Sequence, residues 1–273
     1  MNATLTIALL ASLLVICSYS GSASYLHEQC GLMRDDLSKS LGPWTALLHE
    51  DGSIFCAGTL ITDVFILTAA SCIRPSAVKV RLGEFGRFPD ELAEDHLVHF
   101  SLRYRLFNND SLANNIGLLK LTKRVQIKAY IMPVCIIINP QQKVSTSRFF
   151  GNAWKQDSNV SLTKEFGPIL IQSKPQMCIN LDLYTQFCAG HPGNLRSCDG
   201  LAGSPLIQTS RYLSKTRNVQ FGIATVNDMG CKESQGYTDV LKFYWWIQDV
   251  VSVFNHYSTN QSYVVDDYIN EDF

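Results

Sequence analysis

The sequence has little charge, and no part of it is strongly basic. Lysine, arginine, aspartate and glutamate together make up 17% of the 273 residues, and the formal net charge is −1. Proteins that bind nucleic acid or an anionic membrane surface use clustered lysine and arginine, because these side chains attract phosphate. The sequence therefore gives no reason to expect a nucleic acid or a membrane surface as the partner.

Long apolar runs are also scarce, and the main one lies at residues 5–17. Small residues follow it as far as Ala23. This pattern is typical of a secretory signal peptide, which we assign to residues 1–23. The run is shorter than the roughly 20 apolar residues of a transmembrane helix, so a signal anchor is the less favoured alternative. The mature protein is expected to be secreted and extracellular, with no membrane span.

No Cys-x-x-Cys pair occurs, which argues against a structural zinc site, and we expect no metal or other cofactor. Once Cys17 is removed with the signal peptide, an even set of cysteines remains: Cys30, Cys56, Cys72, Cys135, Cys178, Cys188, Cys198 and Cys231. In a secreted chain, an even number indicates a disulfide framework. Such a set allows about 105 pairings, so spacing does not choose among them.

Three Asn-x-Ser sequons lie in the mature chain, at Asn109, Asn159 and Asn260. Each asparagine is a candidate glycosylation site if it lies on a surface loop. The sequence therefore predicts a glycoprotein.

Short runs rich in β-branched, aromatic and leucine residues follow one another from Trp44 onwards, separated by Gly, Asn, Asp and Pro. This spacing predicts an all-β barrel or sandwich. The exception is residues 240–254, where apolar residues recur at the spacing of an amphipathic helix. We expect this helix to pack on the second half of the chain.

The segments on either side of this region have a different composition. Residues 24–43 are too few for a compact module, so we expect an N-terminal arm that carries Cys30. Residues 255–273 are polar and then acidic, which predicts a flexible tail. The alternative is an interaction tail in which acidic residues flank Tyr268.

The most specific pattern in the chain surrounds Ala202. It reads Arg196-Ser197-Cys198-Asp199-Gly200-Leu201-Ala202-Gly203-Ser204-Pro205-Leu206. It resembles the nucleophile loop of the trypsin-like (chymotrypsin-fold) serine proteases, Asp/Ser-Ser-Cys-x-Gly-Asp-Ser-Gly-Gly-Pro-Leu. Other motifs of that family follow in the same order, at residues 55–61, 65–72, 114–121, 187–190, 236–240 and 246–247. The chain is most similar to the non-catalytic serine protease homologues of invertebrates.

The resemblance implies an all-β fold of two six-stranded antiparallel Greek-key barrels with a C-terminal α-helix. The protease homology domain would span residues 44–254, with barrel 1 at about 44–140 and barrel 2 at about 141–254. The resemblance also implies four disulfides that together use every mature cysteine: Cys30–Cys135, Cys56–Cys72, Cys178–Cys188 and Cys198–Cys231.

Acyl transfer on this fold needs a serine nucleophile, a histidine base and a carboxylate that orients the histidine. The resemblance assigns these positions to Ala202, Ser71 and Asn115. Alanine has no nucleophile, serine is not a base near neutral pH, and asparagine has the shape of aspartate without its charge. Losing one member of the triad costs about four to six orders of magnitude in rate. We therefore expect no proteolytic activity.

Other parts of the family's machinery are altered as well. Leu201 replaces the aspartate that receives the new amino terminus after activation, and residues 34–43 contain no Ile-Val-Gly-Gly motif to supply that terminus. The backbone amides of Gly200 and Ala202 are a remnant of the oxyanion loop. The resemblance aligns Arg196 with the base of the family's specificity pocket, where it would fill the pocket or attract a carboxylate; the alternative is that it turns to solvent.

No replacement for the missing triad is evident. Ser197 and Ser204 lie near Ala202 in sequence, but no base accompanies them. His96 and His99 are three residues apart in an expected strand, which would place them on opposite faces. Histidines in such settings are usually packing or surface residues.

The sequence thus predicts a secreted, catalytically inactive serine protease homologue that acts by binding an extracellular protein. A serine protease or zymogen is the candidate partner, and regulation of an extracellular protease cascade is the expected role. Two alternatives stay open. A serine-type endopeptidase with residual or non-standard activity would react with a fluorophosphonate probe, and an extracellular structural or adhesive protein would self-associate.

Overall fold

The structure is a computed structural model that describes most of the region from Trp44 to Phe254. The residues described are 25–32, 42–76, 78–83, 92–138, 148–151, 153–156, 162–165, 169–178, 181–190, 201–212, 215–225 and 234–255. The expected signal peptide, nearly all of the expected tail and the expected Cys198–Cys231 pair therefore lie outside the described residues.

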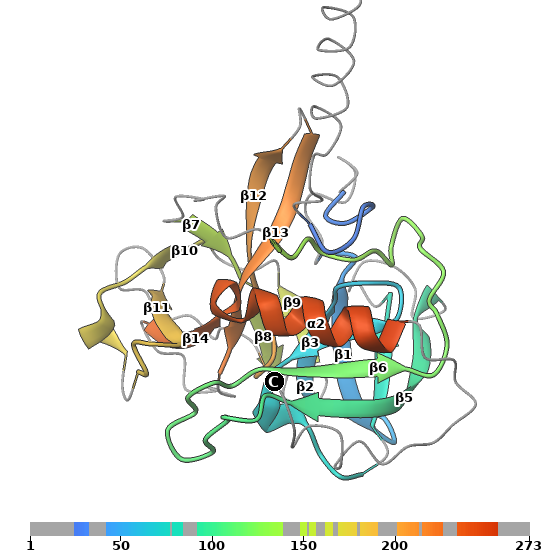
Figure 1. The fold of residues 1–273 in the computed structure, drawn as a ribbon, viewed down its shortest axis with the longest axis horizontal. Coiled ribbons are helices and arrows are strands. Elements are labelled where there is room, and N and C mark those ends of the chain that lie inside the picture. Colours follow the sequence, from blue (N-terminus) through green and yellow to red (C-terminus); the bar gives the residue numbers. More distant parts are fainter. Residues whose placement is uncertain are drawn as a thin grey trace, which may run out of the picture.

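The first half of the chain forms a closed antiparallel barrel with the strand order β1-β2-β3-β6-β5-β4 (Figure 1). Its strands are β1 (Thr45–Glu50), β2 (Ser53–Leu60), β3 (Phe65–Thr68), β4 (Lys79–Leu82), β5 (Glu94–Arg103) and β6 (Gly117–Leu121). Strands β1 and β2 are joined by Asp51-Gly52, whose φ angles are 46° and 87°. Asp-Gly tolerates positive φ at both positions, which a tight two-residue hairpin requires.

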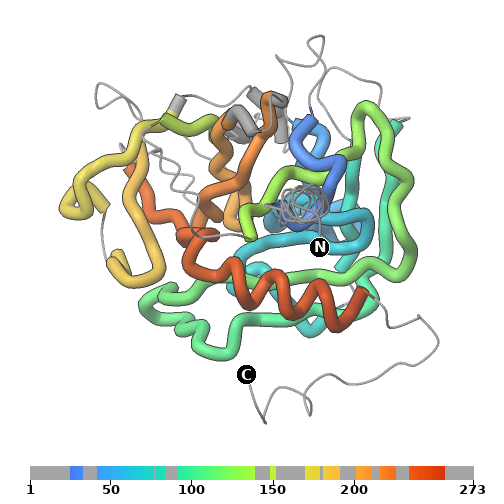
Figure 2. The backbone as a smooth tube through the Cα atoms, turned by 45° about the horizontal axis from the view of Figure 1, so that its top comes forward, coloured from blue at the N-terminus to red at the C-terminus, as the bar shows by residue number. Residues whose placement is uncertain are grey.

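The second half forms another closed barrel, with the order β10-β11-β14-β13-β12-β7. Its strands are β7 (Arg148–Phe150), β10 (Ile169–Gln172), β11 (Gln186–Gly190), β12 (Pro205–Tyr212), β13 (Lys215–Ala224) and β14 (Ser234–Asp239). Strands β8 (Ala153–Gln156) and β9 (Leu162–Glu165) pair as a separate two-stranded sheet. Figure 2 shows the two barrels side by side. The predicted fold class is confirmed.

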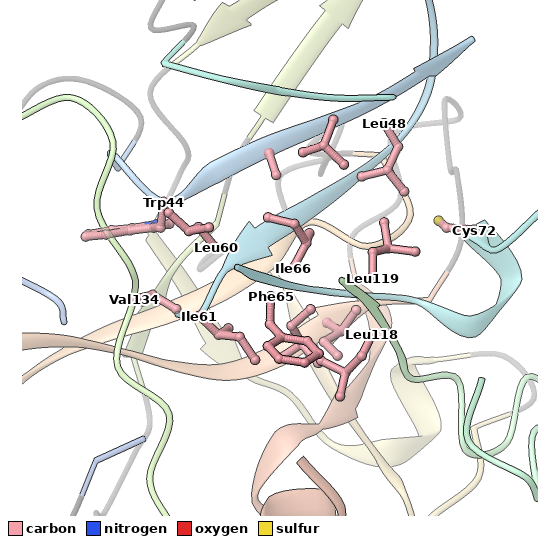
Figure 3. Packing of buried hydrophobic residues seen from close by; sticks show 14 of the residues in the cluster. Trp44, Leu48, Leu60, Ile61, Phe65, Ile66, Cys72, Leu118, Leu119 and Val134 are labelled. Carbon is pink, nitrogen blue, oxygen red and sulfur yellow. The ribbon is translucent and has the colours of Figure 1, made fainter. Parts of the chain in front are cut away.

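The main hydrophobic core fills the first barrel and extends beyond it. Phe65 of β3 and Leu118 of β6 pack together on one face of the sheet, and Ile66 of β3 packs with Leu119 of β6 on the other face (Figure 3). The same cluster includes Ile207 and Ile223 of the second barrel. Each such side chain contributes about 1.5–3 kcal/mol through burial. One continuous core therefore holds the two barrels together.

The described part of the N-terminal arm, residues 25–32, is bound to the body of the protein. Cys30 is bonded to Cys135. The Gly31 amide donates to the Pro133 carbonyl at 2.7 Å, and the Asn218 amide of β13 donates to the Gly31 carbonyl at 2.9 Å. The arm is thus held both by a disulfide and by backbone hydrogen bonds.

The chain reaches its C-terminal helix through a short 3-10 turn. The turn η5 (Val240–Phe243) leads into helix α2 (Tyr244–Asn255), and the Asp239 carboxylate accepts from the Leu241 amide at 3.0 Å to cap the turn. Burial raises the pKa of Asp239. The predicted amphipathic face is present, because Ile247 and Val251 are the buried residues of α2.

The expectation that this helix packs on the second half of the chain is wrong. Ile247 and Val251 belong to the main core of the first barrel. The Tyr104 ring, just after β5, meets the rings of Phe243 and Trp246 edge-on, with centroids 5.0 and 5.5 Å apart. In Figure 2 the red helix starts beside the second barrel and runs along the first. Periodicity identifies the apolar face of a helix but not the surface that this face covers.

None of the helices in the described ranges combines the length and apolar character needed to cross a bilayer.

Candidate functional site

Ser71 lies in a short 3-10 turn that directly follows β3. The turn, η2 (Ala70–Cys72), is closed by the Ile73 amide, which donates to the Ala70 carbonyl at 3.1 Å. Cys72 is bonded to Cys56 of β2, so a disulfide fixes the residue next to Ser71. The Ser71 side chain is half-buried. The fold therefore holds Ser71 in one place on the first barrel.

Asn115 is fully buried just before β6, and its amide joins the two barrels. Its Oδ1 accepts from the Ser71 backbone amide at 2.9 Å. Its Nδ2 donates to the Ser71 hydroxyl at 3.2 Å and to the Thr225 carbonyl at 3.1 Å. The Thr238 hydroxyl of β14 donates to the Asn115 carbonyl at 3.0 Å. Both ends of the side-chain amide are thus hydrogen-bonded.

Ala202 lies in the loop that leads into β12, and backbone hydrogen bonds hold this loop to both barrels. Its carbonyl accepts from the Ala57 amide of β2 at 2.9 Å. The Gly203 amide donates to the Ala224 carbonyl at 2.9 Å, and the Ala224 amide donates to the Ser204 carbonyl at 2.9 Å. Ala202 itself is buried, with 3% of its surface exposed.

The residue after Ala202 must be glycine for two reasons. Gly203 has a φ of +85°, which side-chain-bearing residues rarely adopt. A Cβ at this position would lie 2.0 Å from the Ala57 carbonyl oxygen and 2.5 Å from the Thr68 hydroxyl. Glycine therefore lets the loop approach the first barrel closely enough for the Ala57–Ala202 hydrogen bond.

Leu201 anchors the same loop in an apolar cluster. It is buried with Leu47 and Ala57, and the partly buried Ile54 and Tyr130 pack against them. At the aligned position the family carries an aspartate, whose charge would be desolvated in such surroundings. The leucine is buried, so its apolar side chain suits these surroundings.

The structure brings the three aligned positions together at the junction of the barrels. Ser71 and Asn115 are hydrogen-bonded to each other, and the Cys72 sulfur lies 3.4 Å from the Ala202 carbonyl oxygen. The side chains at these positions are a hydroxyl, an amide and a methyl group. None of them titrates near neutral pH, and none carries charge. They can donate or accept hydrogen bonds, but they contain no base and no carboxylate.

Three of the four expected disulfides are present: Cys30–Cys135, Cys56–Cys72 and Cys178–Cys188. The remaining expected pair, Cys198–Cys231, lies outside the described residues, as do Arg196 and Gly200. Asn159 and Asn260 also lie outside them. Asn109 is exposed in the loop between β5 and β6, so it meets the surface condition for a glycan.

The expected placement of the two strand histidines needs correction. The register of β5 against β6 shifts between Val98 and Phe100, so His99 is the extra residue of a β-bulge. A bulge interrupts the alternation of faces, so the assignment of His96 and His99 to opposite faces has no basis. His96 lies 3.5 Å from Glu94, and burial lowers the pKa of His96. Neither histidine is hydrogen-bonded to Ser71, Asn115 or Ala202.

Comparison with known proteins decides the family. The model of the family described as trypsin matches residues 34–247. The chain belongs to the trypsin family. The motif that fixed the alignment of Ala202 therefore lies within a domain of that family.

Individual relatives in this family are distant. "Serine protease grass" of Drosophila melanogaster is 25% identical, and the match covers 80% of this chain and 66% of the relative. "Mannan-binding lectin serine protease 1" of Homo sapiens is 27% identical, over 80% of this chain and 35% of the relative. The match thus spans less than two thirds of the length of these curated relatives.

A solved structure shows the same fold. The crystal structure described as the Drosophila Grass clip serine protease of the Toll pathway superposes with a TM-score of 0.69. The match covers 88% of this chain and 78% of that one, at 22% sequence identity.

Two partners of the site were not found from the sequence. The Thr225 carbonyl and the Thr238 hydroxyl both bind Asn115, yet each is more than a hundred residues away from it in the chain. Thr225 carried a weak signal, because it begins the Thr-Val-Asn stretch that replaces the family's Ser-Trp-Gly strand. Thr238 lies within the family motif at residues 236–240, but that motif does not show which residue its hydroxyl contacts.

Proposed function

We propose that this trypsin-family protein is secreted, has no proteolytic activity and acts by binding another extracellular protein. The observation that carries the proposal is the side-chain set at the barrel junction, where Ala202, Ser71 and Asn115 occupy the aligned triad positions. Ala202 leaves no atom to attack a carbonyl, and Ser71 leaves no base to accept a proton.

The hydrogen bonding of Asn115 supports this proposal. In an active triad, the carboxylate orients the base and stabilises its protonated form. Here Nδ2 of the amide donates to the Thr225 carbonyl, a contact that a carboxylate would turn into repulsion between two acceptors. The surroundings of Asn115 are therefore matched to a neutral amide, which fits a structural role for this residue.

Ser204 follows Ala202 by two residues in the chain, and it is a poor substitute nucleophile. Its Oγ has no hydrogen-bond partner within the described ranges, and only 3% of the residue is exposed. A nucleophile must be reached by substrate and needs an adjacent base. Enzymatic activity remains the second candidate, because the curated relatives are named as serine proteases.

The first experiment tests catalysis. The full-length protein is treated with a fluorophosphonate probe, beside active trypsin as a positive control, and then with a peptide library. We expect no covalent adduct and no cleavage. A stoichiometric adduct on any serine, lost with the matching Ser→Ala variant, would overturn the proposal and establish the enzyme.

The second experiment tests binding. The relatives are named as serine proteases, and the solved structure with the same fold is described as a protease of the Toll pathway. We accordingly propose a regulator or cofactor of an extracellular protease cascade. The glycosylated protein is used as bait in extracellular fluid, beside a variant truncated after Asn255. Recovery of a protease or zymogen supports a regulator, whereas recovery of copies of the bait supports a structural or adhesive protein.

A further inference from the structure

A cavity of about 230 Å³ opens in the wall of the first barrel, and its lining includes Cys72, which follows Ser71 in the turn η2. Its lining includes Arg74 from the segment after η2, and Val98, His99, Phe100 and Ser101 from β5, with Leu119 of β6. It does not include Ser71, Asn115 or Ala202. Pockets for drug-sized ligands occupy roughly 300–1,000 Å³, so this cavity fits a single large side chain.

The cavity has a cause in the strand geometry. The bulge in β5 falls at His99, between Val98 and Phe100, and all three residues line the cavity. A bulge leaves one residue unpaired and bends its strand. The barrel wall is therefore irregular where the cavity opens.

Positive charge dominates around this cavity. None of the described residues that line it is acidic. The Arg74 guanidinium lies 3.6 Å above the Phe55 ring, and Arg103 donates to the carbonyl of Ile73, another lining residue. Glu50 offsets part of this charge, since it lies 3.7 Å from Arg74 and accepts from the Ser76 hydroxyl. Arg74 thus lines the cavity, while Arg103 and Glu50 each contact a residue of its lining.

The last described turn of the chain lies beside the cavity. The centroids of the Phe254 ring of α2 and the Phe100 ring are 4.9 Å apart, and Phe100 lines the cavity. The described residues end at Asn255. The 14 residues from Phe254 to Tyr268 can span up to about 45 Å, so Tyr268 can reach the cavity.

The composition of residues 256–273 complements the cavity. The segment has no lysine or arginine, and its four carboxylates lie close to Tyr268, at Asp266, Asp267, Glu271 and Asp272. Tyr257 and Tyr263 have no acidic neighbours within two residues. Tyr268 is the tyrosine of this segment that has carboxylates on both sides, whereas Phe273 has Glu271 and Asp272 on one side only.

We propose that this cavity is the binding site for Tyr268 of the same chain, with the flanking carboxylates against Arg74 and Arg103. The ring fills the space between the bulged strand and the segment after η2. Each carboxylate–guanidinium contact is a charge-assisted hydrogen bond, which is stronger than one between neutral groups. This inference does not rest on the proposed function, because Ser71, Asn115 and Ala202 do not line the cavity.

Hydrogen exchange of the full-length protein tests the proposal from the tail side. In the wild type, amides around Tyr268 and in residues 98–101 are expected to exchange slowly. Tyr268→Ser should speed exchange in both segments by about tenfold or more, while Tyr257→Ser, the matched control in the same tail, should leave both unchanged. Tail amides that exchange at the rate of an unstructured chain in the wild type, or equal effects of the two variants, would overturn the proposal.

A second set of variants tests it from the barrel side. Ser101→Phe fills the cavity and Arg74→Glu reverses its charge, so each should release the tail. Lys174→Glu, an exposed charge change on the second barrel, should not. If Ser101→Phe does not fold, Tyr268→Ser still decides the matter, because it leaves the barrel unchanged. Tail protection that rises with protein concentration would assign the cavity to the tail of a second copy and contradict the proposal.

Discussion

At the residue scale, the side-chain amide of Asn115 forms hydrogen bonds to both barrels. Asn115 is fully buried, its Oδ1 accepts from the Ser71 backbone amide, and its Nδ2 donates to the Thr225 carbonyl. Asn115→Ala leaves both groups without a partner, and each orphaned group costs about 1–3 kcal/mol. We expect a loss of about 2–4 kcal/mol in the free energy of unfolding, measured by denaturant titration.

The control for this prediction is Gln176→Ala, since Gln176 has an exposed amide side chain and should change stability little. Asn115→Asp is the informative third variant. It keeps an acceptor for Ser71 but faces the Thr225 carbonyl with a second acceptor, so at neutral pH it should also be destabilising. Equal stability of wild type and Asn115→Asp would contradict the structural role of the amide.

Leu201 supports a second prediction at the same scale. Leu201→Ala removes a buried side chain from the cluster with Leu47 and Ala57, which costs about 2–5 kcal/mol. Leu201→Asp should cost more, because an unpaired carboxylate would be buried there. Thermal unfolding followed by circular dichroism measures both. Leu183→Ala is the control, because Leu183 is 66% exposed. A Leu201→Asp variant as stable as wild type would show that the loop does not need its apolar anchor.

At the element scale, one polar network ties together three strands of the first barrel. Asp95 of β5 accepts from Arg81 of β4 at 2.8 and 3.2 Å, and its Oδ1 lies 3.2 Å from Nε2 of the buried His49 of β1. The hydrogen bond from Arg81 is the largest cause that lowers the pKa of Asp95. A carboxyl pKa that is lower in the folded than in the unfolded protein stabilises the folded state. This stabilisation is complete at pH values above the unfolded pKa of about 3.9, and it is lost as the pH falls through the folded pKa.

We therefore expect Asp95→Asn to reduce stability at neutral pH and to make little difference in strong acid. The reduction should be modest, up to about 1 kcal/mol, because Asp95 and Arg81 are both partly exposed. Denaturant midpoints of the two proteins, measured from pH 7 down to pH 2, should converge below about pH 4. A difference that stays constant across this range would mean that the charge of Asp95 contributes nothing.

The elements also show what the sequence could and could not predict. The motifs placed Ser71, Asn115 and Ala202 because each stands in a short local pattern, and the 3.6-residue period found the apolar face of α2. The surface beneath α2 was predicted wrongly, and the bulge at His99 was not predicted. Both depend on contacts between distant parts of the chain, such as Tyr104 with Trp246. The spacing of apolar residues along the sequence does not show which distant segments pack together.

At the scale of the whole molecule, the two barrels are bound too closely to unfold separately. The main core includes Ile66 of the first barrel and Ile223 of the second, and Ala57 of the first is hydrogen-bonded to Ala202 of the second. Separating the barrels would expose that shared apolar surface to water. We therefore expect a single calorimetric transition, with equal calorimetric and van't Hoff enthalpies.

Variants confined to one barrel make this expectation testable. Ile66 lies in the main core, whereas Leu170 lies in a separate cluster within the second barrel. Both are fully buried, so replacement by alanine should cost about 2–5 kcal/mol in each case. If the barrels are one cooperative unit, both variants shift the same single transition to lower temperature. If the transition splits, and each variant moves only one component, the shared core does not couple the barrels.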